Sequence, residues 1–123
     1  MKILFEHANY FKYSQNKIFS QEIKDCLIAR ICFEEGDAIN LAAILKEMEK
    51  INNLLKPKIL VLFPFAHLSN RIMDSPSAKE LLERITALLN QRGILTKSLP
   101  FGVDKGYELS VKEHKLNNIY REL

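Results

Sequence analysis

The stretch that decides the fold is Lys58–Phe65, KILVLFPF, an almost continuous apolar run rich in Leu, Ile and Val. Residues 26–33, CLIARICF, and residues 94–99, ILTKSL, precede and follow it in the chain and also have strand-like composition. A strand that is apolar on both of its faces is typical of the centre of a covered sheet. We therefore interpret Lys58–Phe65 as the core strand of the fold.

Two amphipathic segments alternate with these strands. After Asp37, which can cap a helix, apolar residues recur at three- and four-residue spacing up to Leu55, and Pro57 ends the pattern. The second segment, residues 75–93, has a proline near its first turn, a Ser77–Glu80 capping box and a terminal glycine. Each segment therefore predicts a helix with one buried stripe.

The remaining patterned segments are short. Residues 2–7 and 10–13 are β-type runs joined tightly through residues 8–9, which predicts an opening hairpin. Residues 107–111 are a further predicted strand, and residues 116–123 are predicted to form a closing helix. Together these segments predict one α/β domain with a mixed β-sheet, two main helices and a short C-terminal helix.

The composition is that of an ordinary single domain. The 123 residues are 47% hydrophobic and 27% charged, and no repeat or Gly/Ser linker divides them. The longest apolar run is far shorter than the ~20 residues of a membrane-spanning helix, and the first residues contain no signal-peptide core. We therefore expect a cytoplasmic protein with no membrane segment. Cys26 and Cys32 match no zinc spacing and are expected to be buried thiols.

The positive charge lies in the second part of the chain. Residues 1–53 contain seven Lys or Arg and eight Asp or Glu, whereas residues 54–123 contain eleven and seven. The net charge of +3 therefore comes from residues 54–123. An anionic partner such as a nucleic acid would bind there, although charge alone equally fits solvated faces.

Most catalytic motifs are absent. The sequence contains no phosphate-binding glycine loop, no His-Glu-x-x-His and no Gly-x-Ser-x-Gly, and His7, His67 and His114 are too scattered to predict a metal site. Ligands of α/β sheets gather beyond the carboxyl ends of strands. Two loops there have unusual content: residues 63–69, FPFAHLS, and residues 100–105, PFGVDK.

His67 and Lys105 are the residues of these loops that could act on a ligand. His67 directly follows the core strand and precedes a helix start, where free backbone N–H groups bind anions. On position alone, His67 could equally cap the strand, and Lys105 could be a solvated lysine paired with Asp104. The residue pattern by itself therefore supports a small α/β domain with one candidate site.

Taken together, the two loops resemble the N-terminal editing domain of archaeal threonyl-tRNA synthetases. The opening residues, with Tyr10 and Tyr13, agree more loosely, and the similarity spans nearly the whole chain. The specific tracts are residues 61–69 (VLFPFAHLS), Pro76–Ala78 before a leucine-patterned helix, Arg92-Gly93, and Pro100-Phe101-Gly102 followed three residues later by Lys105.

The resemblance implies that residues 1–123 are an editing domain with a D-aminoacyl-tRNA deacylase-like fold, usually a homodimer. It also implies hydrolysis of serine wrongly attached to threonine tRNA. A pocket shaped for threonine cannot strongly reject serine, because one missing methyl group costs only about 1–3 kcal/mol, and a second, smaller pocket can remove the error. The implied partner is the acceptor end of tRNA(Thr) carrying serine. The chain would act in trans or joined to a threonyl-tRNA synthetase catalytic domain.

The resemblance also implies a mechanism without metal or cofactor. In the family, water attacks the ester with help from the 2′-hydroxyl of the terminal ribose and a lysine, and main-chain groups set much of the specificity. Lys105 matches that lysine, and His67 is the second residue implied for catalysis. The residues implied to bind the substrate are Phe33, Ala66, Ala78, Phe101, Gly102, Val103 and Asn118.

Two positions depart from the family pattern. The pattern has an aromatic residue directly before the lysine and an acid in the closing helix, whereas this chain has Asp104 and Asn118. Asn118 can hydrogen-bond a ribose or a water but cannot act as a base. Two alternatives therefore stay open: a non-catalytic tRNA-binding or dimerisation module of the same fold, and a D-aminoacyl-tRNA deacylase.

Overall fold

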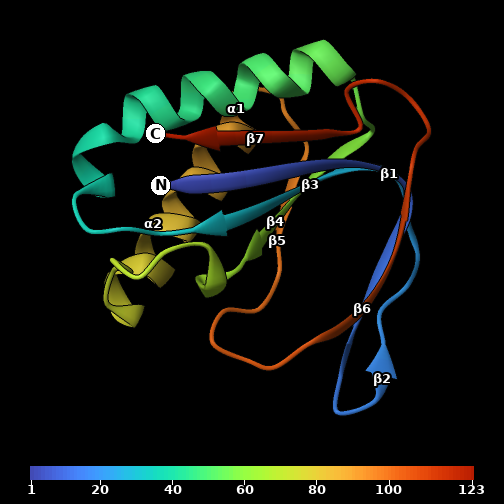
Figure 1. Ribbon diagram of the computed structural model, residues 1–123, viewed down its shortest axis with the longest axis horizontal. Helices are drawn as coiled ribbons and strands as arrows, with labels where there is room; N and C mark the ends of the chain where they lie inside the picture. The colour runs from blue at the N-terminus through green and yellow to red at the C-terminus, as the bar shows by residue number, and fades with distance from the viewer.

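The computed structural model describes residues 1–123 as one seven-stranded sheet with two α-helices (Figure 1). The sheet order is β2-β1-β3-β4-β5, and β6 and β7 also pair with β1. Strands β3, β4 and β5 run parallel, while every pairing of β1 is antiparallel, which confirms the predicted α/β class with a mixed sheet. The elements are β1 (Lys2–Gln15), β2 (Ile18–Phe19), β3 (Ile23–Cys32), the 3₁₀ turn η1 (Asp37–Asn40), α1 (Leu41–Leu55), β4 (Ile59–Pro64), the 3₁₀ turn η2 (Ala66–Leu68), α2 (Ser75–Gln91), β5 (Thr96–Ser98), β6 (Gly106–Val111) and β7 (Asn118–Glu122).

Strand β4 is the core strand that the run KILVLFPF predicts. It lies between β3 and β5 and is parallel to both. Leu60 and Leu62 belong to the larger core cluster, and Val61 and Phe63 belong to a smaller cluster on the other face of the sheet. Because both faces are covered, apolar residues occupy successive positions of this strand.

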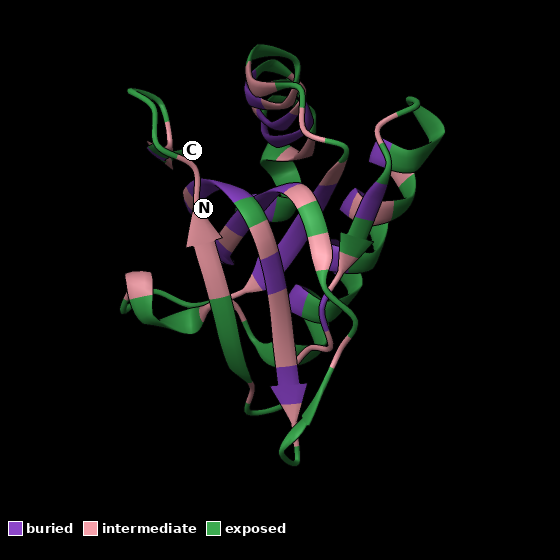
Figure 2. Cartoon of the chain, turned by 90° about the vertical axis from the view of Figure 1, so that its right-hand side faces the viewer, coloured by how far each residue is buried: buried purple, intermediate pink, exposed green.

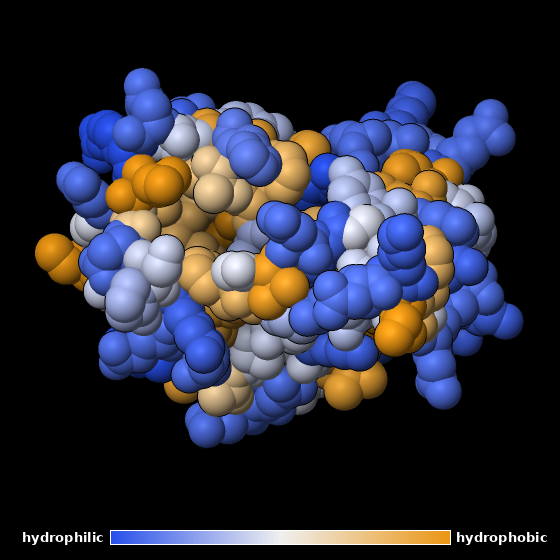
Figure 3. Space-filling model, turned by 90° about the horizontal axis from the view of Figure 1, so that it is seen from below, coloured by the Kyte–Doolittle hydropathy of each residue, from blue (hydrophilic) through white to orange (hydrophobic).

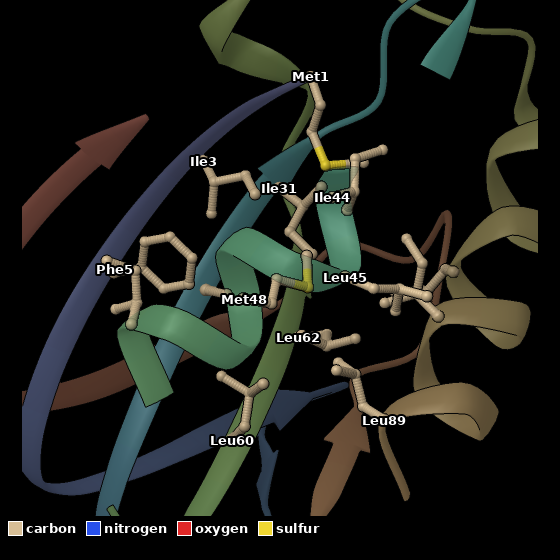
Figure 4. Packing of buried hydrophobic residues seen from close by; sticks show 14 of the residues in the cluster. Met1, Ile3, Phe5, Ile31, Ile44, Leu45, Met48, Leu60, Leu62 and Leu89 are labelled. Carbon is tan, nitrogen blue, oxygen red and sulfur yellow. The ribbon is translucent and has the colours of Figure 1, made fainter. Parts of the chain in front are cut away.

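The larger core lies between the sheet and the two helices, as the stripes of both helices predict. Each large apolar side chain that is fully buried there stabilises the fold by about 1.5–3 kcal/mol. Figure 4 shows side chains of the helices meeting those of the sheet: Ile44, Leu45 and Met48 of α1 and Leu89 of α2, with Met1, Ile3, Phe5, Ile31, Leu60 and Leu62.

Strand β1 takes part in both cores because it bends. Its residues Ile3 and Phe5 belong to the larger cluster, whereas Ala8 and Phe11 belong to the smaller one. A register shift between Ala8 and Tyr10 in the pairing with β6 marks the point of change. Such a bulge bends a strand and increases its twist. Figure 2 shows the curled part of the sheet from outside, with buried and more exposed positions interspersed along its strands.

The predicted hairpin through residues 8–9 is therefore wrong. Residues on both sides of the bulge pair with the same neighbour, β3, so β1 continues to Gln15. The chain turns instead at Asn16 and Lys17, whose φ angles are 52° and 63°. A two-residue hairpin turn with both central residues at positive φ matches the twist of the flanking strands.

The predicted closing helix is also wrong, because Asn118–Glu122 forms strand β7. β7 pairs with the first half of β1, opposite Lys2–Glu6, and Ile119 is buried there. The segment extends the sheet along an edge of β1 that would otherwise be open. The edge belongs to residues 2–6, which lie more than 100 positions before β7 in the sequence. The local pattern of residues 116–123 could therefore not reveal this pairing.

Both helices begin differently from the prediction. Asp37 lies in η1 and does not cap α1; its carboxylate accepts hydrogen bonds from the Met1 ammonium at 2.7 Å and the Glu34 N–H at 2.6 Å. Helix α2 is capped by Asp74, which accepts a hydrogen bond from the Ser77 N–H at 3.0 Å, instead of by the predicted capping box. The two main predicted helices are thus correct, whereas their predicted caps are not.

The cysteines lie where the sequence predicts. Cys26 and Cys32 are both buried and neither forms a disulfide. Burial raises the pKa of the Cys26 thiol to about 12, so this group stays protonated at neutral pH. Neither α1 nor α2 is long and apolar enough to cross a lipid bilayer.

Candidate functional site

A cavity of about 320 Å³ opens at the carboxyl ends of the parallel strands β3 and β4. It is surrounded by the residues that follow β4, by the segment that leads into α2, and by the loop after β5. Figure 3 shows an apolar hollow among hydrophilic side chains at this end of the molecule. The 14 lining residues are Ile31, Phe33, Pro64, Phe65, Ala66, Ile72, Met73, Ser75, Ala78, Phe101, Gly102, Val103, Asp104 and Lys105.

Main-chain hydrogen bonds fix two of these segments to the end of β3. The N–H of Phe65 donates to the carbonyl oxygen of Ile31 at 2.8 Å, and the N–H of Met73 donates to that of Phe33 at 2.9 Å. In the third segment, Gly102 has a φ of 73°. This left-handed conformation costs other residues about 1–2 kcal/mol, so glycine is the residue that suits the turn.

The structure brings seven of the nine predicted site residues together. Phe33 and Ala78 are buried in the wall of the cavity, with exposed fractions of 5% and 2%. The other five come from the two loops singled out in the sequence, and all of them line the same cavity: Ala66, Phe101, Gly102, Val103 and Lys105. Loops about 35 residues apart in the chain therefore meet around one space.

His67 lies beside the cavity but does not line it. Its side chain is exposed in the turn η2, and its ring packs edge-on against that of Phe65, with ring centres 5.0 Å apart. Phe65 itself is a lining residue. The histidine therefore reaches the cavity only through Phe65 in this arrangement.

The structure does not place Asn118 at the cavity. The prediction assumed a closing helix, but Asn118 begins strand β7, opposite Glu6 of β1, and its side-chain amide donates to Asn117. Strands β1 and β3 separate β7 from β4 in the sheet. Asn118 also lies at the end of β7 away from the cavity, because β7 runs antiparallel to β1, whose N-terminal end lies beside the end of β3.

Lys105 is the cation of the cavity. Its side chain is half-buried; its ammonium donates a hydrogen bond to the carbonyl oxygen of Val103 at 2.7 Å and lies 5.9 Å from the ring centre of Phe63. Burial lowers the pKa of Lys105 below its ordinary value, and the charge of Asp104 acts in the opposite direction. An ammonium has three N–H donors, so two remain available to a ligand.

Asp104 lines the same cavity, yet it does not form an ion pair with Lys105. The ammonium of Lys105 turns instead to the main chain at Val103. The picture of a solvated turn lysine paired with its neighbour therefore does not describe this residue.

A cluster of one cation and several aromatic rings adjoins the cavity, and the sequence analysis missed it. The guanidinium of Arg30 lies 4.9 Å from the ring centre of Tyr107 and 5.5 Å from that of Phe65, and it donates to the Tyr107 hydroxyl at 2.9 Å. Its Nε lies 2.6 Å from Oε1 of Glu6. An arginine inside the otherwise apolar run CLIARICF is the signal that could have pointed to it.

A second, larger hollow of about 710 Å³ shares Ile72, Met73 and Ser75 with the cavity but contains none of the predicted site residues. It lies against η1 and the first turns of α2. No group of three or more His, Cys, Asp or Glu side chains is arranged to hold a metal ion. Because the predicted site residues line the smaller cavity and not this hollow, the smaller cavity is the candidate site.

Comparison with known proteins gives matches over the whole chain. The family model described as the archaea-specific editing domain of threonyl-tRNA synthetase matches residues 1–123. Among similar proteins, a threonine–tRNA ligase of Methanopyrus kandleri is 31% identical over 98% of this chain and 22% of its own length. One of Methanobrevibacter smithii is 31% identical over 100% of this chain and 23% of its own length. The chain thus spans about a fifth of the length of these relatives.

A solved structure shows the same fold. The protein named c-Myc DNA Unwinding Element Binding Protein aligns with a TM-score of 0.77 and covers 100% of this chain and 99% of its own. The identity between the two sequences is 12%, so the likeness concerns the fold alone. It is the D-aminoacyl-tRNA deacylase-like fold that the sequence led us to expect.

Proposed function

Because the chain belongs to the archaea-specific editing-domain family of threonyl-tRNA synthetase, we propose that it hydrolyses the ester of serine wrongly attached to tRNA(Thr). The observation that supports this most is the meeting of Ala66, Phe101–Val103 and Lys105 around one cavity. The editing domain would act on aminoacyl-tRNA that has left the aminoacylation site. At that first site, serine is only weakly discriminated from threonine, because the two differ by one methyl group.

In this proposal, Lys105 is the catalytic residue. Its ammonium has free N–H donors and lies against the Phe63 ring, partly shielded from water. When water attacks the ester, negative charge develops on the carbonyl oxygen, and a positioned cation in a site of low polarity stabilises that charge more than it would in bulk water. The 2′-hydroxyl of the terminal ribose, which the family resemblance implies, belongs to the substrate and would assist the attacking water.

The walls of the cavity would provide the selectivity. Nine of the lining residues are hydrophobic, and Phe33 and Ala78 are almost fully buried among them. A closely packed wall tolerates the serine hydroxymethyl group but resists the additional methyl of threonine, because extra carbon in a packed site forces side chains or backbone to move. The space also exceeds the volume of a serine side chain, which leaves room for part of the terminal adenosine.

The proposal includes several partners. The excess of Lys and Arg over Asp and Glu in residues 54–123 suits the phosphates of the tRNA(Thr) acceptor end. As in the relatives, which are about five times as long, the domain would act beside a threonyl-tRNA synthetase catalytic domain, or in trans. We also propose a homodimer and a cytoplasmic location.

The test is hydrolysis of L-seryl-, D-seryl- and L-threonyl-tRNA(Thr). We expect L-seryl-tRNA to be deacylated and L-threonyl-tRNA to be left intact. Equal stability of all three esters, together with salt-dependent tRNA binding, would favour the non-catalytic tRNA-binding module. Preference for the D-seryl ester would favour a D-aminoacyl-tRNA deacylase.

A variant of Lys105 tests the residue assignment. Lys105→Met should abolish hydrolysis while leaving the fold and most of the tRNA affinity, because one ammonium is a small part of a phosphate-contact surface. Lys115→Met is the matched control, since Lys115 is an exposed lysine that forms no ion pair and does not line the cavity. Normal turnover by Lys105→Met would contradict the role of this lysine.

A further inference from the structure

The candidate cavity contains one charge of each sign. Among its 14 lining residues, only Asp104 and Lys105 are charged, and they are adjacent in the chain. The other side chains are apolar apart from the hydroxyl of Ser75, and glycine has no side chain. A ligand that fills this open cavity therefore meets a carboxylate and an ammonium among largely apolar side chains.

The carboxylate of Asp104 has no partner within the protein. It accepts no hydrogen bond and forms no ion pair, whereas Glu108, an exposed acid of β6, is paired with Lys12. Its nearest cationic neighbour in sequence, Lys105, is held by the carbonyl oxygen of Val103. Both oxygens of Asp104 are thus free to accept hydrogen bonds from a bound molecule.

From this arrangement we propose that Asp104 binds the α-ammonium group of the aminoacyl ester and so selects substrates whose amine is free. The proposal rests on the proposed function of the same cavity. In an aminoacyl-adenosine, the α-ammonium is the one cationic group, and the ester carbonyl is the group that becomes negative during hydrolysis. Asp104 matches the first and Lys105 matches the second.

Holding both groups orients the substrate. A hydrogen bond between an ammonium and a carboxylate is about twice as strong as one between neutral groups. With the amine at Asp104 and the carbonyl at Lys105, the Cα substituents of the amino acid take fixed directions, so the side chain faces one wall of the cavity. An N-acylated aminoacyl ester lacks the positive charge and is larger at the same point, so it binds poorly.

The test compares the binding of two non-hydrolysable ligands by calorimetry. The first is 3′-deoxyadenosine with L-serine attached through an amide at the 3′ position, and the second is the same compound with hydrogen in place of the α-amine. The wild-type protein should bind the first about ten-fold more tightly, the lower end of what a hydrogen bond to a charged group contributes. Asp104→Asn should bind both with equal affinity.

Two controls make the outcome specific. Glu108→Gln removes an exposed acid of β6 that pairs with Lys12 and does not line the cavity, and it should keep the ten-fold preference. Asp104→Glu should recover part of it. Circular dichroism should show native folding for Asp104→Asn, because the carboxylate has no partner to lose.

Each result separates this proposal from the function on which it rests. If Asp104→Asn keeps the preference, or if the wild-type protein binds both ligands equally, the role of Asp104 is wrong while the cavity remains an aminoacyl-adenosine site. If the wild-type protein binds neither ligand, the function proposed for the cavity is overturned, and the role of Asp104 with it.

Discussion

The α-ammonium of Met1 donates a hydrogen bond of 2.7 Å to Oδ1 of Asp37, the first residue of η1, and both groups are buried. Glu34 lies 2.9 Å from the same nitrogen, and the carbonyl oxygen of Leu123 accepts a further hydrogen bond from it. A sequence pattern suggested that Asp37 caps a helix, yet its actual partner is the beginning of the chain. This contact joins β1 to the loop between β3 and α1.

This pairing makes stability depend on pH in the alkaline range. Burial lowers the pKa of the Met1 ammonium, but the hydrogen bonds that the ammonium donates to Asp37 and Glu34, together with the negative charges of both acids, outweigh burial, so the pKa is raised above 8.0. A raised pKa contributes stability that is complete below 8.0 and lost as the pH rises through the folded-state value. Urea unfolding at a series of pH values above neutrality should therefore show a falling free energy of unfolding.

Asp37→Asn tests whether the Met1–Asp37 pair causes this alkaline dependence of stability. The substitution should lower the free energy of unfolding by about 2 kcal/mol at neutral pH, because it leaves a buried ammonium with a weaker partner. It should also flatten the alkaline dependence. An unchanged alkaline slope in the variant would show that other groups cause it.

His7 and His114 should produce a second dependence, in the acid range. The N–H of Leu116 donates to Nδ1 of His114, so Nε2 of His114 holds the proton that it shares with Nδ1 of His7 at 2.9 Å. Burial, then the charges of Lys112 and His114, lower the pKa of His7 below 6.5, while Asp25 acts in the opposite direction. Protonation of His7 at Nδ1 would break its hydrogen bond to His114.

The sign follows from the direction of the shift. A histidine with a lowered folded-state pKa contributes stability that is present above 6.5 and lost as the pH falls toward the lowered value. Urea unfolding should thus give a lower free energy at mildly acidic pH than at neutral pH, and His7→Phe should remove most of the difference. Equal acid sensitivity in His7→Phe would assign the effect to another group.

Leu62→Ala should be among the most destabilising single substitutions. Leu62 is fully buried in β4, between the sheet neighbours and both helices. Removing its side chain leaves a cavity and should cost about 3 kcal/mol in urea unfolding. The matched control, Leu95→Ala, changes a leucine that is 63% exposed and should cost less than about 0.5 kcal/mol. A similar cost for both would contradict the central place of β4.

Gly102→Ala should impair the site more than the fold. A Cβ at Gly102 meets no atom within 4 Å, so the effect comes from its φ of 73°, which costs an alanine about 1 kcal/mol. The strain should shift the loop that holds Lys105 and reduce kcat/KM for seryl-tRNA. Gly36→Ala is the control, because Gly36 has a φ of 88° with equally open surroundings but does not line the cavity. It should lose similar stability and keep its activity.

The sequence predicted best where neighbouring residues decide the structure. The apolar run around Leu62 and the spacing of Ile44, Leu45 and Met48 are local signals, and both held in the structure. Residues 8–9 and 116–123 were predicted wrongly because their conformation depends on pairing with distant strands. Neither the bulge in β1 nor the open edge that β7 covers can be recognised from the neighbouring residues in the sequence.

The candidate site was likewise predicted well where local sequence decides its position and poorly where distant pairing does. The two loops could be foreseen as neighbours because parallel strands end at one edge of a sheet, and the structure places them around one cavity. Asn118 was misplaced because the segment was expected to be a helix. Arg30 and the rings around it were missed, since only the folded sheet brings Tyr107 and Phe65 to the same guanidinium.

Strand β1 pairs with β2, β3, β6 and β7, which makes it the partner of the last strand as well as of early ones. During synthesis on the ribosome, β1 is made well before β6 and β7, so one of its edges stays uncovered until these two strands follow. An uncovered strand edge readily pairs with another chain. Newly made copies are thus most prone to aggregate in the interval before Asn118–Glu122 leaves the exit tunnel.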